Sequence, residues 1–237
     1  MKKWMALALF AGMLLISARA FAFGLPNVAS ALTGGGGGTA DVNGLISNAA
    51  NLKTKMTNAS ICLAEALVLA EKAVGNAALA EKLEAAIADV KASKDDLEKT
   101  KVLNAVCNTA TDELASIDLE AKMDKTQARE NLGKSLLQLG AGTLLDLQAA
   151  NAAKGMVGSI QGAISGVKSN PLAYGPSTIT GLTSALSTAT YAVEALPSQA
   201  TKMASLSKRF ADYATTNSIP QPSQKDGEKM AENLTPR

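Results

Sequence analysis

The chain has 237 residues, of which 47% are hydrophobic, 3% aromatic and 19% charged, with a formal net charge of +2. This composition can supply an apolar helical core but few aromatic side chains for a ligand pocket. Histidine is absent, which excludes histidine acid–base catalysis, serine–histidine nucleophiles and the commonest zinc ligand. We therefore predict a non-enzymatic protein without catalytic, cofactor-binding or metal-binding residues.

Residues 1–22 have the pattern of a secretory signal peptide. Lys2 and Lys3 precede an apolar run over residues 4–17, and Ala20-Phe21-Ala22 predicts cleavage before Phe23. The alternatives are a cut two residues earlier and a retained membrane helix, although the apolar run of 14 residues is shorter than the roughly 20 that span a bilayer. Cleavage would place the protein in the periplasm or outside the cell.

Removal of the signal peptide changes the charge balance of the chain. Lys2, Lys3 and Arg19 leave with it, so 20 basic and 21 acidic residues remain. A chain this close to neutral, without a basic run among aromatic residues, has no general attraction for nucleic acid. We therefore expect no nucleic-acid partner.

Residues 23–40 are predicted to form a flexible leader. They contain five consecutive glycines, residues 34–38. Glycine has the largest backbone entropy to lose on ordering and no side chain to bury.

A helical pattern starts at Val42. Apolar residues are then spaced alternately three and four apart over four heptads, which is typical of a coiled-coil seam. Asp41 can cap the start of this helix, and Gly75-Asn76 can end it. The small residues on the seam favour close antiparallel packing in a bundle. The seam consists of Val42, Leu45, Ala49, Leu52, Met56, Ala59, Leu63, Ala66 and Ala70.

No glycine or proline interrupts residues 76–132, yet the apolar phase shifts after Leu97. We infer a break near residues 93–96, where Ser93 and Asp96 have the spacing of a capping box. The alternative is a single very long helix.

Cys62 and Cys107 are the two cysteines of the chain. An even pair in an exported protein predicts a structural disulfide. Two straight helices turned at Gly75 would leave these residues too far apart for a bridge. A bridge within the chain therefore needs a break or a shifted turn between them, and the alternative is that they bond to other chains.

Two further helices are predicted. The first opens at Asp124 or Thr126 and ends at Ser169-Asn170-Pro171, and the second follows Tyr174-Gly175-Pro176. Pro197 is expected to kink or split the second one. Residues 217–237 are polar and contain proline, which predicts a disordered tail.

Gly158, Gly162 and Gly166 recur every four residues in a segment without charge. Glycine disfavours a helix by up to about 1 kcal/mol per residue, so three on one face need a reason. Close approach of a partner helix is such a reason. The partner helix is predicted to lie within the bundle, in another protein or second copy, or in a membrane-inserted hairpin.

Together these patterns predict an all-α fold, an elongated antiparallel bundle of four to five helices over residues 41–216. We expect a role in binding, scaffolding or assembly, through a protein partner or self-association and without a small-molecule cofactor. The alternative is a membrane-active or pore-forming protein that inserts the low-charge segment 136–196. Between Ser135 and Thr201 that region has only four acidic or basic residues, Asp146, Lys154, Lys168 and Glu194.

Overall fold

The computed structural model describes residues 41–93, 96–169 and 174–235. These residues form seven helices that pack together, and no strand occurs within the described ranges. The predicted all-α class is thus confirmed. All seven helices belong to one compact unit, Leu32–Arg237. The predicted signal peptide and leader lie outside the described residues.

Helix α2 (Val42–Ala73) begins and ends where the sequence predicts. The Asp41 carboxylate accepts a hydrogen bond from the backbone N–H of Gly44 at 3.0 Å. Gly75 follows the helix with a φ of +80°, a conformation that glycine adopts without steric cost. Asn76 then caps the next helix by accepting from the Leu79 N–H at 3.4 Å.

The predicted break near residues 93–96 is confirmed. Helix α3 (Ala77–Ala92) ends there, and α4 (Leu97–Ser116) begins after it. The predicted capping box of Ser93 and Asp96 does not form: Ser93 caps the end of α3, and Asp96 is itself the N-cap of α4 and accepts from the Glu98 N–H at 2.9 Å. A short helix that the sequence pattern did not predict, α5 (Leu119–Lys122), follows α4.

The two longest helices are α6 (Lys125–Ser169) and α7 (Pro176–Thr216). Asp124 opens α6 as predicted, because its carboxylate accepts from the Gln127 N–H at 2.8 Å. Helix α7 is not split at Pro197 but continues to Thr216.

The predicted disordered tail is wrong for its described part, which contains helix α8 (Gln224–Leu234). Ser223 and Asp226 form a capping box at its start, with the same three-residue spacing as Ser93 and Asp96. Ala231 is buried, with Met230 and Leu234 packed beside it. Local capping and a short apolar face therefore order a segment whose composition alone indicates disorder.

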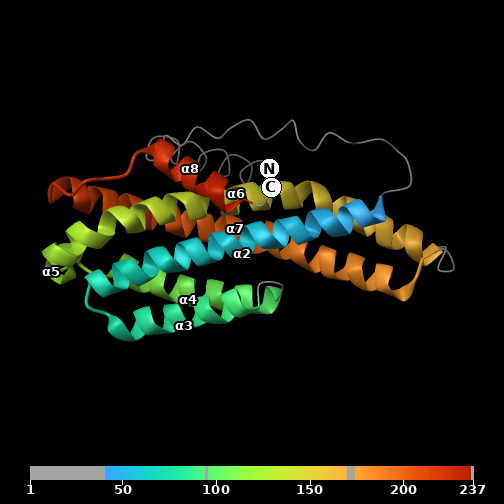
Figure 1. Ribbon diagram of the computed structural model, residues 1–237, viewed down its shortest axis with the longest axis horizontal. Coiled ribbons are helices and arrows are strands. Elements are labelled where there is room, and N and C mark those ends of the chain that lie inside the picture. Colours follow the sequence, from blue (N-terminus) through green and yellow to red (C-terminus); the bar gives the residue numbers. More distant parts are fainter. Residues whose placement is uncertain (1–40, 94–95, 170–173, 236–237) are drawn as a thin grey trace, which may run out of the picture. The chain divides into compact units, whose positions relative to one another are not determined.

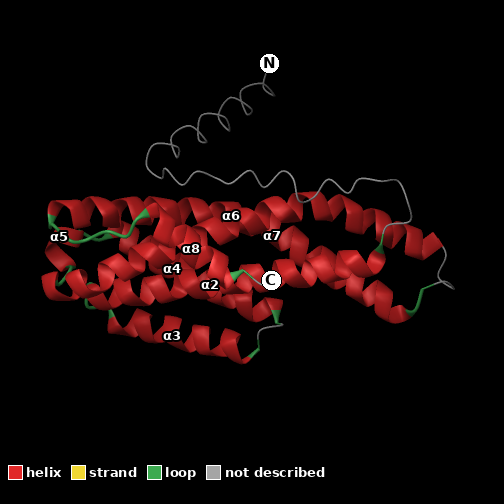
Figure 2. Ribbon diagram, turned by 45° about the horizontal axis from the view of Figure 1, so that its top comes forward, coloured by secondary structure: helices red, strands yellow, loops and turns green. Residues whose placement is uncertain are grey.

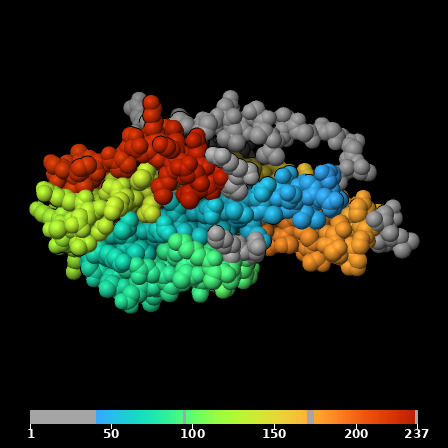
Figure 3. Space-filling model, in the orientation of Figure 1, coloured from blue at the N-terminus to red at the C-terminus, as the bar shows by residue number. Residues whose placement is uncertain are grey.

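Helices α2, α6 and α7 run side by side, as Figures 1 and 2 show. The α3–α4 pair packs on α2, α4 also contacts α7, and α8 packs on α6. In the space-filling view these shorter helices cover one half of the long ones, and the blue start of α2 and the orange start of α7 extend beyond them (Figure 3). We call residues 42–56, 149–169 and 176–196 the distal segment.

The buried apolar side chains form two large clusters and a small one. The proximal core joins α3 and α4 to the later part of α2 from Leu63 onward, and includes α7 from Met203 onward. The distal core lies inside the distal segment and is rich in alanine, with Met56, Ile160 and Leu182 among its larger members. A small third cluster lies beneath α8.

Candidate functional site

A group of polar side chains lies between the proximal and distal cores. Each of the long helices α2, α6 and α7 places polar residues in this group, near the point where one apolar cluster ends along the helix and the next begins. Five of these residues are buried, and Tyr191 is half-buried. We call the group the polar layer, and it consists of Thr57, Thr100, Asn104, Asp146, Tyr191 and Gln199.

Hydrogen bonds join three helices across the polar layer. The Asn104 side chain on α4 donates to the Tyr191 hydroxyl at 2.9 Å and accepts from Gln199 Nε2 at 3.0 Å. Thr57 on α2 and Thr100 on α4 share a hydrogen bond of 3.1 Å. A buried polar group destabilises the fold unless it forms a hydrogen bond, so these contacts specify how α4 packs against α2 and α7.

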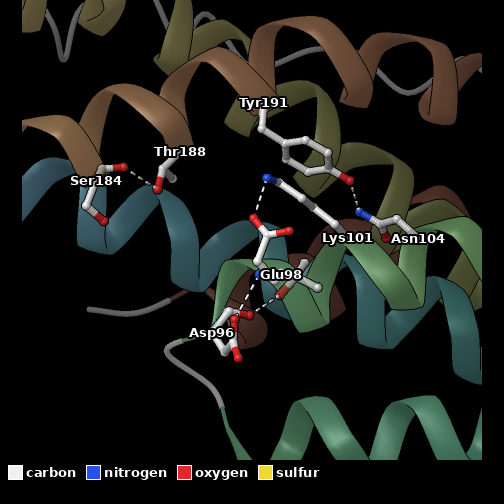
Figure 4. A network of polar contacts seen from close by, with 8 residues as sticks. Asp96, Glu98, Lys101, Asn104, Ser184, Thr188 and Tyr191 are labelled. Atoms are coloured by element: carbon white, nitrogen blue, oxygen red, sulfur yellow. Dashed lines mark hydrogen bonds and ion pairs between the residues drawn. The ribbon is translucent and has the colours of Figure 1, made fainter.

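An ion pair extends the polar layer to the surface (Figure 4). Lys101 Nζ lies 5.5 Å from the centroid of the Tyr191 ring and 2.6 Å from Glu98 Oε1. The ring therefore meets a cation on its face while its hydroxyl accepts from Asn104. Such contacts at a partly exposed site add about 0.5–1 kcal/mol.

Asp146 is the member of the polar layer without a hydrogen bond. It is fully buried in the middle of α6, and neither carboxylate oxygen has a partner. Burial raises the pKa of Asp146 well above its ordinary value, because the charged form loses its hydration. The sequence does signal this residue, as one of four ionisable acids and bases in a long low-charge region, but its burial depends on the packing of three other helices.

The predicted disulfide between Cys62 and Cys107 is wrong: both cysteines are free and buried. Cys62 on α2 donates to the Gln138 carbonyl of α6 at 3.3 Å, while Cys107 lies in the proximal core. The predicted helix break does exist, but it does not bring the two sulfur atoms together. Burial raises the pKa of Cys62 to about 12 and that of Cys107 above its ordinary value, so neither is a reactive thiolate.

Reduction is therefore expected to leave the stability of the folded chain unchanged. The thermal midpoint with and without dithiothreitol, followed by circular dichroism, should agree, and intact mass after alkylation in denaturant should show two free thiols. A lower midpoint in the reductant would contradict this expectation.

A second buried carboxylate lies at the end of α2. Glu71 is buried without a hydrogen bond to its carboxylate oxygens. Its pKa is raised to about 7, first by burial and then by repulsion from Glu113, while the nearby Asn76 side chain acts in the opposite direction. Asn76 in turn donates to Glu113 at 2.8 Å.

Replacement of this group should change the pH dependence of stability. The folded chain holds a proton on Glu71 that the unfolded chain loses near the ordinary pKa of glutamate, so stability falls as pH rises from about 4.5 to about 7. We expect Glu71→Gln to remove that fall and to gain about 1–2 kcal/mol at pH 8, less than the full shift implies because solvent reaches part of this turn. Urea unfolding at several pH values measures the free energy of unfolding, and Glu81→Gln, at an exposed position, is the control. The prediction would be contradicted if the free energy of unfolding changed equally with pH in the two variants.

The glycine face predicted as a helix contact points away from the bundle. Gly158, Gly162 and Gly166 are exposed, and a Cβ atom at any of them would meet no atom within 4 Å. The prediction that they pack inside the bundle is therefore wrong for the described residues. The apolar positions Ile160, Ala163 and Val167 form the buried side of α6 instead.

Close helix contact is made by a different glycine, Gly142. A Cβ there would lie 2.6 Å from Leu63 Cγ and 3.2 Å from the Ala59 carbonyl oxygen of α2. Gly181 of α7 is similarly crowded, because a Cβ atom at that position would lie 2.8 Å from Ile46 Cδ1 of α2. Sequence spacing missed both because each is a single glycine rather than a repeat.

The surface of the distal segment carries few charges. Within its three ranges the exposed charged side chains are Lys154, Lys168 and Glu194, and Lys53 and Lys55 of α2 are half-buried. The other exposed positions are mostly glycine, serine, threonine, asparagine and glutamine, and Ile179 is the large hydrophobic side chain exposed there. Close contact with this surface would desolvate few charges, but the described residues form no broad apolar patch on it.

The described ranges contain no group of three or more side chains arranged to hold a metal ion. Among the same residues, no helix combines the length and the apolar character needed to cross a membrane. The arrangement thus offers a buried polar layer with an ionisable carboxyl and an outer face with few charges. Comparison with known proteins found no family model, no curated protein and no solved structure that matches this chain.

Proposed function

We propose that this protein is an exported, non-enzymatic helical bundle that binds or assembles with protein molecules in the cell envelope or outside the cell. The signal-like residues 1–22 support export. In this proposal the long helices and the α3–α4 pair make up an elongated antiparallel bundle of four to five main helices, and the distal segment carries the contact surface.

The observation that carries the proposal is the exposed glycine face of α6. Gly158, Gly162 and Gly166 weaken the helix by up to about 1 kcal/mol each, and no described helix packs on them. Close approach of a helix from a second molecule would explain their presence, because a glycine face lets two backbones come together. The low charge of the surrounding surface supports the same contact, since few ions would lose their hydration.

Membrane insertion of the segment 136–196 is the alternative proposal. Its low content of charged residues favours it. Its exposed serine, threonine and glycine residues make a poor lipid-facing surface. The two proposals differ in whether the outer face of α6 contacts protein or lipid.

Site-specific photocrosslinking distinguishes them. A photoreactive residue is placed at Ser159 or Ser165, both exposed beside the glycines, and at the exposed Ala105 of α4 as control. In cells that export the chain, we expect protein adducts from the α6 positions and none from position 105. We also expect Gly162→Leu to reduce these adducts without lowering the thermal midpoint.

Absence of protein adducts at both α6 positions would refute the proposed contact. The purified chain from Phe23 to Arg237 is also tested by flotation with neutral and anionic liposomes that hold a trapped dye. Co-flotation with dye release would favour the membrane alternative.

A further inference from the structure

The polar layer divides the interior of the bundle. On α2, Thr57 follows the last distal-core residue, Met56, and precedes Leu63 of the proximal core. Asp146 stands between Leu139 and Ala149 on α6, and Gln199 between Leu196 and Met203 on α7. The two large apolar cores are thus joined across a layer of polar contacts and, beneath α8, across the small third cluster that includes Cys62 and Leu145.

The stability of the polar layer depends on whether the Asp146 carboxyl is protonated. The other members of the layer are linked by hydrogen bonds, whereas both oxygens of the Asp146 carboxyl are unpartnered. A buried neutral carboxyl is tolerated far better than a buried unpaired carboxylate, whose lost hydration costs several kcal/mol.

Besides burial, Asp146 raises the pKa of three neighbouring groups, Cys62 on α2, Cys107 on α4 and Tyr191 on α7, and none of them carries a positive charge. Lys101 is a cation beside the layer, but it lies against the Tyr191 ring and is paired with Glu98 instead of Asp146. Glu65 acts on Cys62 and Glu98 acts on Tyr191, and both are acidic. On α8 the side chains of Lys225, Asp226, Lys229 and Glu232 are exposed, and that of Glu228 is half-buried.

We propose that the polar layer is a pH-responsive joint, closed while Asp146 is protonated and opened when Asp146 ionises. The proton passes to solvent, and water enters the layer to hydrate the carboxylate. Opening loosens the packing of α6 on α2 and α7 around Asp146, and with it the hydrogen bonds of Asn104 to Tyr191 and Gln199, while the proximal and distal cores stay folded. The raised pKa of Asp146 agrees in direction with this, since rising pH is what opens the joint.

Cys62 is a built-in reporter of this opening because it lies outside the proximal and distal cores. Cys107, a proximal-core residue, is the internal control that should react only when the chain unfolds globally. Both are buried beside Asp146 and are the only thiols of the chain. The uncharged reagent 4,4′-dithiodipyridine is added to the full exported chain from about pH 5 to about pH 9. Each rate is divided by the rate for the urea-unfolded chain at the same pH, which removes the intrinsic ionisation of the thiols and leaves an opening constant.

We expect the opening constant at Cys62 of the wild-type chain to rise by up to tenfold per pH unit as Asp146 loses its proton. Asp146→Asn should lose that dependence, and Asp146→Leu should do the same if the asparagine variant folds poorly. The control is Asp89→Asn, which changes an exposed residue of α3 and should follow the wild type.

Two results would overturn the proposal. One is an Asp146→Asn variant that keeps the pH slope of the wild-type chain. The other is an opening constant at Cys62 equal at every pH to the global unfolding constant from urea titration, because the layer would then open only when the whole chain unfolds.

Discussion

Gly142→Leu should lower the free energy of unfolding by at least about 3 kcal/mol, at the upper end of the cost of overpacking a core. The reason is the close crossing of α2 and α6. Even a Cβ at Gly142 would lie 2.6 Å from Leu63 Cγ and 2.7 Å from Leu63 Cδ2. The Ala59 carbonyl oxygen at 3.2 Å belongs to the backbone, so the helices themselves must move apart.

Gly158→Leu is the matched control on the same helix. A Cβ at Gly158 meets nothing within 4 Å, and leucine favours a helix more than glycine does. The control should therefore equal the wild type or gain up to about 1 kcal/mol. Urea unfolding followed by far-ultraviolet circular dichroism measures both variants. Equal losses at the two positions would show that the outer face of α6 is covered in the folded chain.

Asp146→Asn should stabilise the chain at neutral and alkaline pH, by an amount of the order of 2 kcal/mol. The raised pKa of Asp146 in the folded state means that the folded chain binds a proton which the unfolded chain has released. The stability of the wild-type chain is therefore highest below the ordinary pKa of aspartate. It falls by about 1.4 kcal/mol per pH unit until the folded state also ionises.

Glu71 also makes the free energy of unfolding fall as pH rises to about 7. The effect of Asp146 is therefore measured in a Glu71→Gln background. Unfolding free energies of the single and double variants between about pH 4 and about pH 9 give the difference. If Asp146→Asn lowered stability at every pH, the carboxyl would have a favourable partner in the folded chain, contrary to its unpartnered oxygens.

Several element boundaries could be predicted because their causes are local. Asp41, Asp96 and Asp124 each accept a backbone hydrogen bond within three residues, and Gly75 permits the left-handed turn after α2. Helix α8 could also have been found from its Ser223–Asp226 capping box, but its polar composition obscured that signal.

The candidate site could be predicted only in part. Asp146 is visible in the sequence as an isolated acid within a helical apolar pattern. Its partners in the polar layer are not, because Asn104, Tyr191 and Gln199 are separated by up to 95 residues and meet only when α4 packs against α7. The cysteine pairing failed for the same reason, since packing places Cys62 in the small cluster beneath α8 and Cys107 in the proximal core.

Local signals in the sequence were enough to predict the helical class, the starts of α2, α6 and α7 and the break between α3 and α4, because a spacing of three to four apolar residues and a capping side chain act over a few residues. The tertiary structure alone decided which glycine is crowded, where the thiols lie and which carboxyl loses its water. A glycine looks the same in the sequence whether its face meets Leu63, as at Gly142, or open space, as at Gly158. That difference arises from the rotation and crossing of whole helices, which long-range packing sets.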